Sequence, residues 1–354
     1  MFKMHASIGG LAVATALFLA DTALAEPRTV PWEAPASVTT ESIAMTIPSG
    51  DAQISGTLYH PRSGGPFPAL IALHTASSPR RDAGIFQHLI KVLPSIGIAV
   101  FVFDRRGEGA TSGAPARGDY ARLADDGIAV RKAVAAHPRI DGGKTGYWGL
   151  SQGGWLAVLA ASRDPGAAFA VSVSAPLTSP DVQMNFAVAN ILRIKGVADP
   201  EIEIAIAARR SVDDYMRGKV DRPTAQRALD RAASYPWFDD IYMSRTFADP
   251  AQSGWAKEMK HNPVETLRLN SAPTLLIFGA RDPWIPVAAS VELLAGEKML
   301  RPNWTVAVIA DADHSMMTSA TPAEQIDTSK FQTHAPESQA YIATLARWIT
   351  RLGI

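Results

Sequence analysis

The 354-residue chain has 34 basic and 34 acidic side chains, and 47% of its residues are hydrophobic, which suits a protein with one large core. Its formal net charge is zero and it has no basic run, so we expect no nucleic acid partner and no anionic membrane surface. The absence of cysteine excludes a thiol nucleophile, disulfides and cysteine-bound zinc. The eight histidines lack a metal-binding spacing, and we expect neither a metal nor another cofactor.

The first 25 residues have the pattern of a secretory signal peptide. Lys3 precedes an apolar stretch at residues 8–20, and Ala23 and Ala25 form a cleavage site of small residues. An uncleaved membrane anchor is the alternative, but the stretch is shorter than the roughly 20 residues that span a bilayer. We therefore expect cleavage near Ala25, export to the periplasm or the medium, and no stable membrane anchor afterwards.

From residue 43 onward, short apolar runs alternate with segments of helical periodicity. The run at residues 98–103 is apolar throughout, as in strands buried on both faces of a parallel sheet. This alternation predicts an α/β fold with a mostly parallel, doubly wound sheet of eight strands. The predicted strands are residues 43–47 and 54–59 (a hairpin), 69–74, 98–103, 144–150, 168–174, 274–278 and 305–309. The main helices predicted around the sheet are residues 85–93, 120–136, 153–161 and 338–352.

Residues 177–270 interrupt this alternation, because no buried strand is predicted there. Helical periodicity is found instead, at residues 182–194, 200–219 and 223–234. An apolar core strand follows directly, so we interpret the region as a helical cap inserted into the sheet domain, with a separate domain as the alternative. The predicted division is a signal peptide at 1–25, an α/β core at 26–176 and 271–354, and a cap at 177–270.

The sequence Gly149-Leu150-Ser151-Gln152-Gly153 joins a predicted strand to a predicted helix. This is the setting of a nucleophile elbow, a strained turn that lifts a serine hydroxyl above the sheet. The two glycines allow close backbone approach, and the free N–H groups of the helix N-terminus favour a developing oxyanion. We therefore predict that Ser151 is the nucleophile of a hydrolase.

The acid and the base are expected to follow such a serine in that order. Asp282 and His314 lie in the loops after the last two predicted strands, at the sheet edge where the serine is expected. Asp282 could instead be a turn residue before a proline. Asp311 and Asp313 are rival acids, although Asp311 is better explained as a loop former and Asp313 directly precedes the histidine. His334 is the fallback base.

Two backbone N–H groups are expected to stabilise the oxyanion. One belongs to Gln152. The other comes from the loop at residues 74–79 after the third predicted strand, from Ala76 or from the adjacent Thr75. His74, which ends that strand, is expected to be structural.

With these segments the chain resembles bacterial α/β-hydrolases near the dienelactone-hydrolase and prolyl-oligopeptidase-like branch, which include exported esterases with a helical cap. The resemblance extends from residue 43 to the C-terminus. It rests on residues 55–61, 66–69, 78–82, 104–109 and 148–155, together with the aspartate and histidine segments. Within residues 104–109, Asp104 and Arg105 are expected to tie loops together by hydrogen bonds. The chain departs from the family at Thr75, where a glycine is usual, because threonine is bulkier and disfavours a positive φ.

The resemblance implies hydrolysis of a small-molecule carboxylic ester through a Ser–Asp–His triad and an acyl-enzyme. A capped, aromatic pocket would favour small to medium acyl or aryl groups. Trp237 and Phe238 from the predicted cap, and Trp284 near the acid, are candidates for an apolar pocket wall. Packing of the cap is the alternative role for the first two. Amide or peptide hydrolysis, thioesterase or lactonase activity, and a non-catalytic binding protein are the competing functions.

Overall fold

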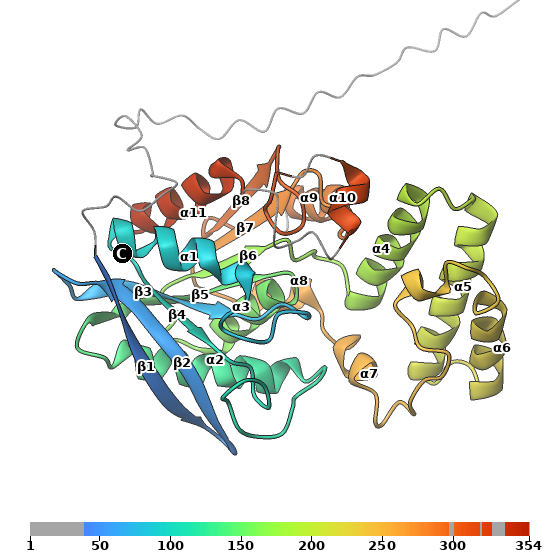
Figure 1. Cartoon of the computed structure of the whole chain (residues 1–354), viewed down its shortest axis with the longest axis horizontal. Helices are drawn as coiled ribbons and strands as arrows, with labels where there is room; N and C mark the ends of the chain where they lie inside the picture. The colour runs from blue at the N-terminus through green and yellow to red at the C-terminus, as the bar shows by residue number, and fades with distance from the viewer. Residues whose placement is uncertain (1–38, 297–300, 319–320, 328–336, 354) are drawn as a thin grey trace, which may run out of the picture.

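The computed structural model describes residues 39–296, 301–318, 321–327 and 337–353, and it contains an eight-stranded sheet (Figure 1). The strand order is β1-β2-β4-β3-β5-β6-β7-β8. The pairs β1–β2 and β2–β4 are antiparallel, and all other neighbours are parallel. The predicted mostly parallel sheet of eight strands is therefore confirmed.

The observed elements are longer than several of the predicted ones. The strands are β1 (Thr40–Ser49), β2 (Ala52–Pro61), β3 (Phe67–Leu73), β4 (Ala99–Phe103), β5 (Ile140–Leu150), β6 (Ala170–Val173), β7 (Thr274–Gly279) and β8 (Trp304–Ile309). The helices that flank the sheet are α1 (Gln87–Val92), α2 (Tyr120–Ala135), α3 (Gln152–Arg163), α9 (Val287–Ala295) and α11 (Gln339–Arg351), whereas α10 (Pro322–Ile326) contacts α4 (Pro180–Ile194).

Both faces of the central strands are buried, because helices cover the sheet on each side. In β3, Ile71 and Leu73 belong to one apolar cluster with α2 and α3, whereas Leu70 and Ala72 belong to a second cluster with α1 and α11. Successive strand residues point to opposite faces, which explains why β3 and β4 are apolar throughout. Figure 1 shows α1 and α11 on one side of the sheet and α2 on the other.

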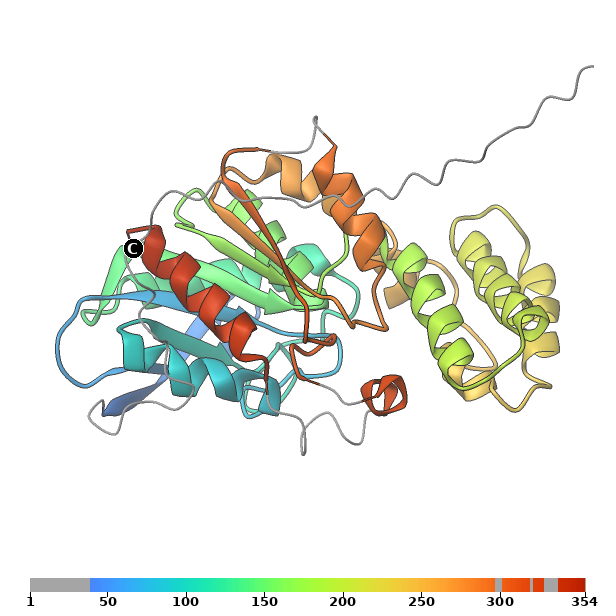
Figure 2. The ribbon, with the colours of Figure 1, turned by 90° about the horizontal axis from the view of Figure 1, so that it is seen from above.

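The chain between β6 and β7 is helical. Figures 1 and 2 both show α4, α5 and α6 grouped beside the sheet, with α7 between them and the core. This helical insertion has its own apolar cluster, which includes Val188, Ala205 and Leu229. Its helices are α4 (Pro180–Ile194), α5 (Asp199–Met216), α6 (Arg222–Ala232), α7 (Gly254–Glu258) and α8 (Pro263–Leu269).

The predicted signal peptide at residues 1–25 and the fallback base His334 lie outside the described residues. The signal peptide therefore stays a prediction. Among the helices that are described, none is long and apolar enough to cross a membrane.

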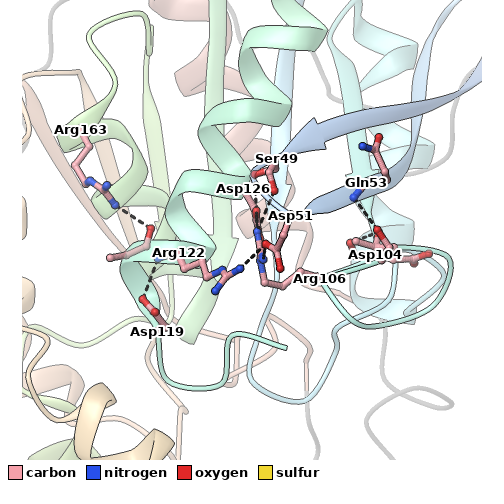
Figure 3. Close-up of polar contacts among 12 residues, drawn as sticks. Ser49, Asp51, Gln53, Asp104, Arg106, Asp119, Arg122, Asp126 and Arg163 are labelled. Carbon is pink, nitrogen blue, oxygen red and sulfur yellow. Dashed lines mark hydrogen bonds and ion pairs between the residues drawn. The ribbon is translucent and has the colours of Figure 1, made fainter. Parts of the chain in front are cut away.

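Buried charges tie the β1–β2 hairpin to the loop after β4 and to α2 (Figure 3). Arg106 donates to both carboxylate oxygens of Asp126, at 2.7 and 2.6 Å, and both side chains are only 2% exposed. The Ser49 hydroxyl donates to the same carboxylate at 2.6 Å, and Arg106 also donates to Asp51 at 2.8 Å. A bidentate, buried pair of this kind holds three segments in one arrangement.

We predict that Arg106→Met lowers the free energy of unfolding by about 3–5 kcal/mol, because it leaves the Asp126 carboxylate buried without its cation. Denaturant unfolding would measure the loss. Arg163→Met is the matched control, since Arg163 pairs with Asp125 at the surface, where the side chains are 39% and 55% exposed and the loss should stay below about 1 kcal/mol. Equal losses in the two variants would contradict the assignment.

Candidate active site

Ser151 is the single residue between β5 and α3. Its backbone has φ 57° and ψ −123°, a left-handed conformation that costs a non-glycine residue about 1–3 kcal/mol. The turn depends on close backbone contacts, because a Cβ at Gly149 would lie 1.9 Å from the Gly153 carbonyl oxygen. A Cβ at Gly153 would in turn lie 2.7 Å from the carbonyl oxygen of Leu73 at the end of β3. The residues thus form the sharp strand-to-helix turn that the motif predicts.

Asp282 and His314 form a hydrogen-bonded pair. The Nδ1 atom of His314 lies 2.7 Å from Oδ2 of Asp282, and because an ionised carboxylate only accepts, Nδ1 carries the proton. The backbone N–H groups of Trp284 and Ile285 donate to the other carboxylate oxygen at 2.7 and 3.2 Å, which fixes the acid. Nε2 of His314 is then left as the acceptor. Within the described residues, the Ser151 hydroxyl forms no hydrogen bond, so the structure joins the acid to the base but neither of them to the serine.

The pKa of His314 is raised. Burial by itself lowers it, but the charge of Asp282 and its hydrogen bond outweigh burial. The rival carboxylates have other partners: Asp311 accepts from the Ser338 hydroxyl at 2.7 Å, and Asp313 accepts from two backbone N–H groups, each at 2.9 Å. The carboxylate bonded to the histidine is that of Asp282.

Both N–H groups expected to stabilise an oxyanion are free. Among the described residues, no acceptor pairs with the N–H of Gln152 at the start of α3 or with that of Ala76 in the exposed loop after β3. Thr75 introduces no strain, because it is absent from the described non-glycine residues with positive φ. Its hydroxyl accepts from the N–H of Ser78 at 3.0 Å and closes a local turn.

His74 and Arg105 fix the loop after β3 through hydrogen bonds to backbone carbonyls. Nε2 of His74 lies 2.6 Å from the Phe103 carbonyl oxygen, and burial and then the Arg105 charge lower the pKa of His74 to about 3. The histidine is therefore neutral and donates to that carbonyl, which agrees with a structural role. Nη2 of Arg105 donates to the Thr75 carbonyl oxygen at 2.6 Å and to Oε1 of Gln152 at 3.0 Å. Its loop-tying role was predicted, but its partners were not.

A polar chain that the sequence did not indicate extends this contact. Nε2 of Gln152 donates to the Tyr120 hydroxyl at 3.2 Å, and that hydroxyl donates to Glu258 of α7 at 3.3 Å. Burial raises the pKa of Glu258, although its hydrogen bond with Tyr120 acts in the opposite direction. The helical insertion is thereby connected to the first residue of α3.

The predicted pocket aromatics lie in two places. The ring of Trp284 is 6.3 Å from that of His314 and 5.5 Å from that of Tyr242. Trp237 and Phe238 are each only 4% exposed and belong to the apolar cluster of the helical insertion. Only Trp284 therefore lies beside the histidine, and the other two have the positions expected of packing residues.

Helix α4 of the insertion contacts the loop of the acid directly. Nε2 of Gln183 donates to the Trp284 carbonyl oxygen at 2.8 Å, and Nδ2 of Asn190 donates to that of Pro283 at 2.9 Å. No sequence pattern distinguishes these two amides from ordinary exposed helix residues.

This sheet, with a serine at a strained turn after β5 and a His–Asp pair after β7 and β8, defines an α/β-hydrolase. The model of a hydrolase family described as serine aminopeptidase, S33, matches residues 80–320, and the chain belongs to this family. No curated protein sequence matches the chain significantly.

Solved structures share the fold at low sequence identity. An α/β-hydrolase, GrgF, from Penicillium is 18% identical with a TM-score of 0.54, over 88% of this chain and 98% of its own. An esterase from Pyrococcus furiosus is 17% identical with a TM-score of 0.53, over 88% of this chain and 92% of its own. An acylaminoacyl peptidase from Pyrococcus horikoshii is 14% identical with a TM-score of 0.52, over 88% of this chain but only 42% of its own.

We predict that His314 titrates above the ordinary histidine pKa of about 6.5. As the pH falls through this raised value, Nε2 becomes protonated and a reaction that needs it as a base is lost. NMR titration of labelled imidazoles would measure the pKa, and Asp282→Asn should lower it, because the charge and hydrogen bond of Asp282 are lost and only the charge of Asp313 still opposes burial. His74 and His88, with pKa values of about 3, and His261, with about 4, stay neutral in this range. A pKa of His314 that Asp282→Asn leaves unchanged would contradict the pairing.

Proposed function

We propose that the protein hydrolyses carboxylic esters through Ser151, His314 and Asp282. The observation that carries the proposal is the combination of a serine at a strained strand-to-helix turn with a histidine whose Nδ1 is bonded to a buried carboxylate. Two free backbone N–H groups, of Gln152 and Ala76, are available for the oxyanion. Proteins similar in fold include an enzyme named as an esterase.

In the proposed mechanism, Ser151 attacks the ester carbonyl carbon while Nε2 of His314 takes the hydroxyl proton. Asp282 keeps the imidazole in the tautomer that leaves Nε2 unprotonated. The N–H groups of Gln152 and Ala76 stabilise the tetrahedral oxyanion, and each such donor is typically worth about 3 kcal/mol. The imidazolium then protonates the departing alcohol.

Water completes the cycle. Nε2 of His314 takes a proton from water as its oxygen attacks the acyl-enzyme, and the second tetrahedral intermediate breaks down to a carboxylic acid and the free serine. The proton on His314 returns to Oγ of Ser151. No cofactor enters either step.

The substrate class is inferred to be small or medium acyl and aryl esters. Trp284 beside His314, with Tyr242 against it, offers an apolar wall next to the reacting atoms. Helix α4, which donates hydrogen bonds to the carbonyls of Pro283 and Trp284, limits the space on that side. An aromatic wall bounded in this way favours short chains over a polymer surface.

The central test compares wild type, Ser151→Ala and the control Ser162→Ala, whose hydroxyl donates only to a carbonyl within α3. We expect a fluorophosphonate to label wild type and Ser162→Ala but not Ser151→Ala, and the latter to lose at least about 10³-fold in kcat/KM. A panel of p-nitrophenyl esters of increasing acyl length, lactones, thioesters and aminoacyl anilides would rank the substrates. Faster turnover of anilides would favour the amide hydrolase instead, and a folded wild type that resists labelling would refute the nucleophile.

We also propose that the protein is exported. The signal-like residues 1–25 support this proposal, and the expected mature N-terminus is Glu26, measurable by mass spectrometry of the protein from the periplasm or the medium. Ala25→Arg should block cleavage, whereas Leu24→Phe should not, because only the flanking alanines need to be small. Recovery of the protein with residues 1–25 attached would contradict cleavage.

A further inference from the structure

The loop that carries Ala76 is held by Arg105 at both of its ends. The Arg105 backbone N–H donates to the Pro79 carbonyl oxygen at 2.8 Å, and its guanidinium donates to that of Thr75 at 2.6 Å. Asp104, which is buried, holds the backbone next to Arg105 in place by accepting from the N–H groups of Arg81 and Ala110, both at 2.9 Å. The guanidinium is thus a rigid support rather than a mobile surface charge.

Because Arg105 binds the Thr75 carbonyl oxygen, the Thr75–Ala76 peptide bond sets the direction in which the Ala76 N–H points. In a trans peptide the C=O and the following N–H point in opposite directions. Because Arg105 holds the Thr75 carbonyl on one side, the Ala76 N–H is aimed at the other side. A cationic donor on the carbonyl also polarises the amide and makes its N–H a stronger donor.

The same guanidinium nitrogen contacts both segments that are expected to supply an oxyanion donor, the loop after β3 and the start of α3. Arg105 donates to the Gln152 side chain at 3.0 Å, and Gln152 is the other residue whose backbone N–H is free. The start of α3 lies against this loop, since a Cβ at Gly153 would be 3.0 Å from the His74 carbonyl oxygen. One charged group therefore contacts both residues next to the expected oxyanion position.

We infer that Arg105 is a positioning residue that orients the Ala76 N–H toward the oxyanion and fixes its position relative to the Gln152 N–H. This inference rests on the proposed function. Arg105 acts from behind the peptide and does not touch the substrate. The contacts explain why Thr75 is accepted in this loop: the loop is held through the threonine carbonyl and hydroxyl, without a positive φ at this position.

The test compares Arg105→Met with Arg139→Met. Arg139 also donates to backbone carbonyls, that of Pro61 at the end of β2 and those of Arg62 and Gly64 in the loop that follows. It lies next to the start of β5, at the opposite end of that strand from Ser151. We expect Arg105→Met to lower kcat about 10- to 100-fold, below the effect typical of deleting a donor outright, with KM within about threefold of wild type. Arg139→Met should keep the wild-type kcat.

Two further readouts separate positioning from general structural damage. Affinity for a trifluoromethyl ketone, which forms a tetrahedral oxyanion adduct, should fall by the same factor as kcat/KM. Low millimolar guanidinium should restore part of kcat to Arg105→Met and none to Arg139→Met. The inflection of the pH profile should not move, because the Asp282–His314 pair is untouched.

The outcomes distinguish failure of the proposed function from failure of the inference on Arg105. If wild type does not react with a fluorophosphonate, the proposed function fails and this inference falls with it. If wild type reacts and folded Arg105→Met keeps kcat within twofold, or loses it without any change in ketone affinity, the inference alone is overturned. If Arg105→Met does not fold, the deciding variant is Gln152→Leu, which removes the side-chain acceptor that Arg105 binds. A kcat reduced threefold or more then supports the inference, whereas a kcat within twofold of wild type overturns it.

Discussion

The structure depends on a single constraint, the change from strand β5 to helix α3 at one residue. With no linker available, Ser151 must adopt a positive φ, and the backbones on either side must approach closely enough that only glycine fits at positions 149 and 153. The surrounding packing stabilises this strain, because β5 is a central strand with β3 and β6 on its two sides. Among the described residues, no acceptor pairs with the N–H of Gln152 at the start of α3, as the proposed oxyanion stabilisation requires.

Around this turn, buried polar contacts hold the loops at the carboxyl ends of the strands, in addition to apolar packing by residues such as Ile285 and Met316. Arg106 with Asp126 fixes the loop after β4 to α2, and Arg105 fixes the same loop to the one after β3. Charge-assisted hydrogen bonds suit this task, since they are directional and lose much free energy when one partner is removed. The positions of backbone N–H groups thereby become as well defined as those of side chains.

The helical insertion takes part in the same arrangement. Its first helix donates to the carbonyls next to Asp282, and Glu258 of α7 closes the polar chain that begins at Arg105. Both ends of the insertion thus contact residues adjacent to the site. These contacts join the insertion to the acid loop and to the start of α3.

The sequence by itself predicted the eight strands, the sharp turn at Ser151 and the candidate residues Ser151, Asp282 and His314 in that chain order, because hydrophobic periodicity and turn chemistry are local properties. It left open the choice among Asp282, Asp311 and Asp313, and only the tertiary structure decided which carboxylate bonds to His314. Likewise, only the tertiary structure revealed the partners of Arg105 and separated Trp284 from the packing residue Trp237. Those outcomes depend on angstrom-scale distances between segments that are far apart in the chain, which no local pattern encodes.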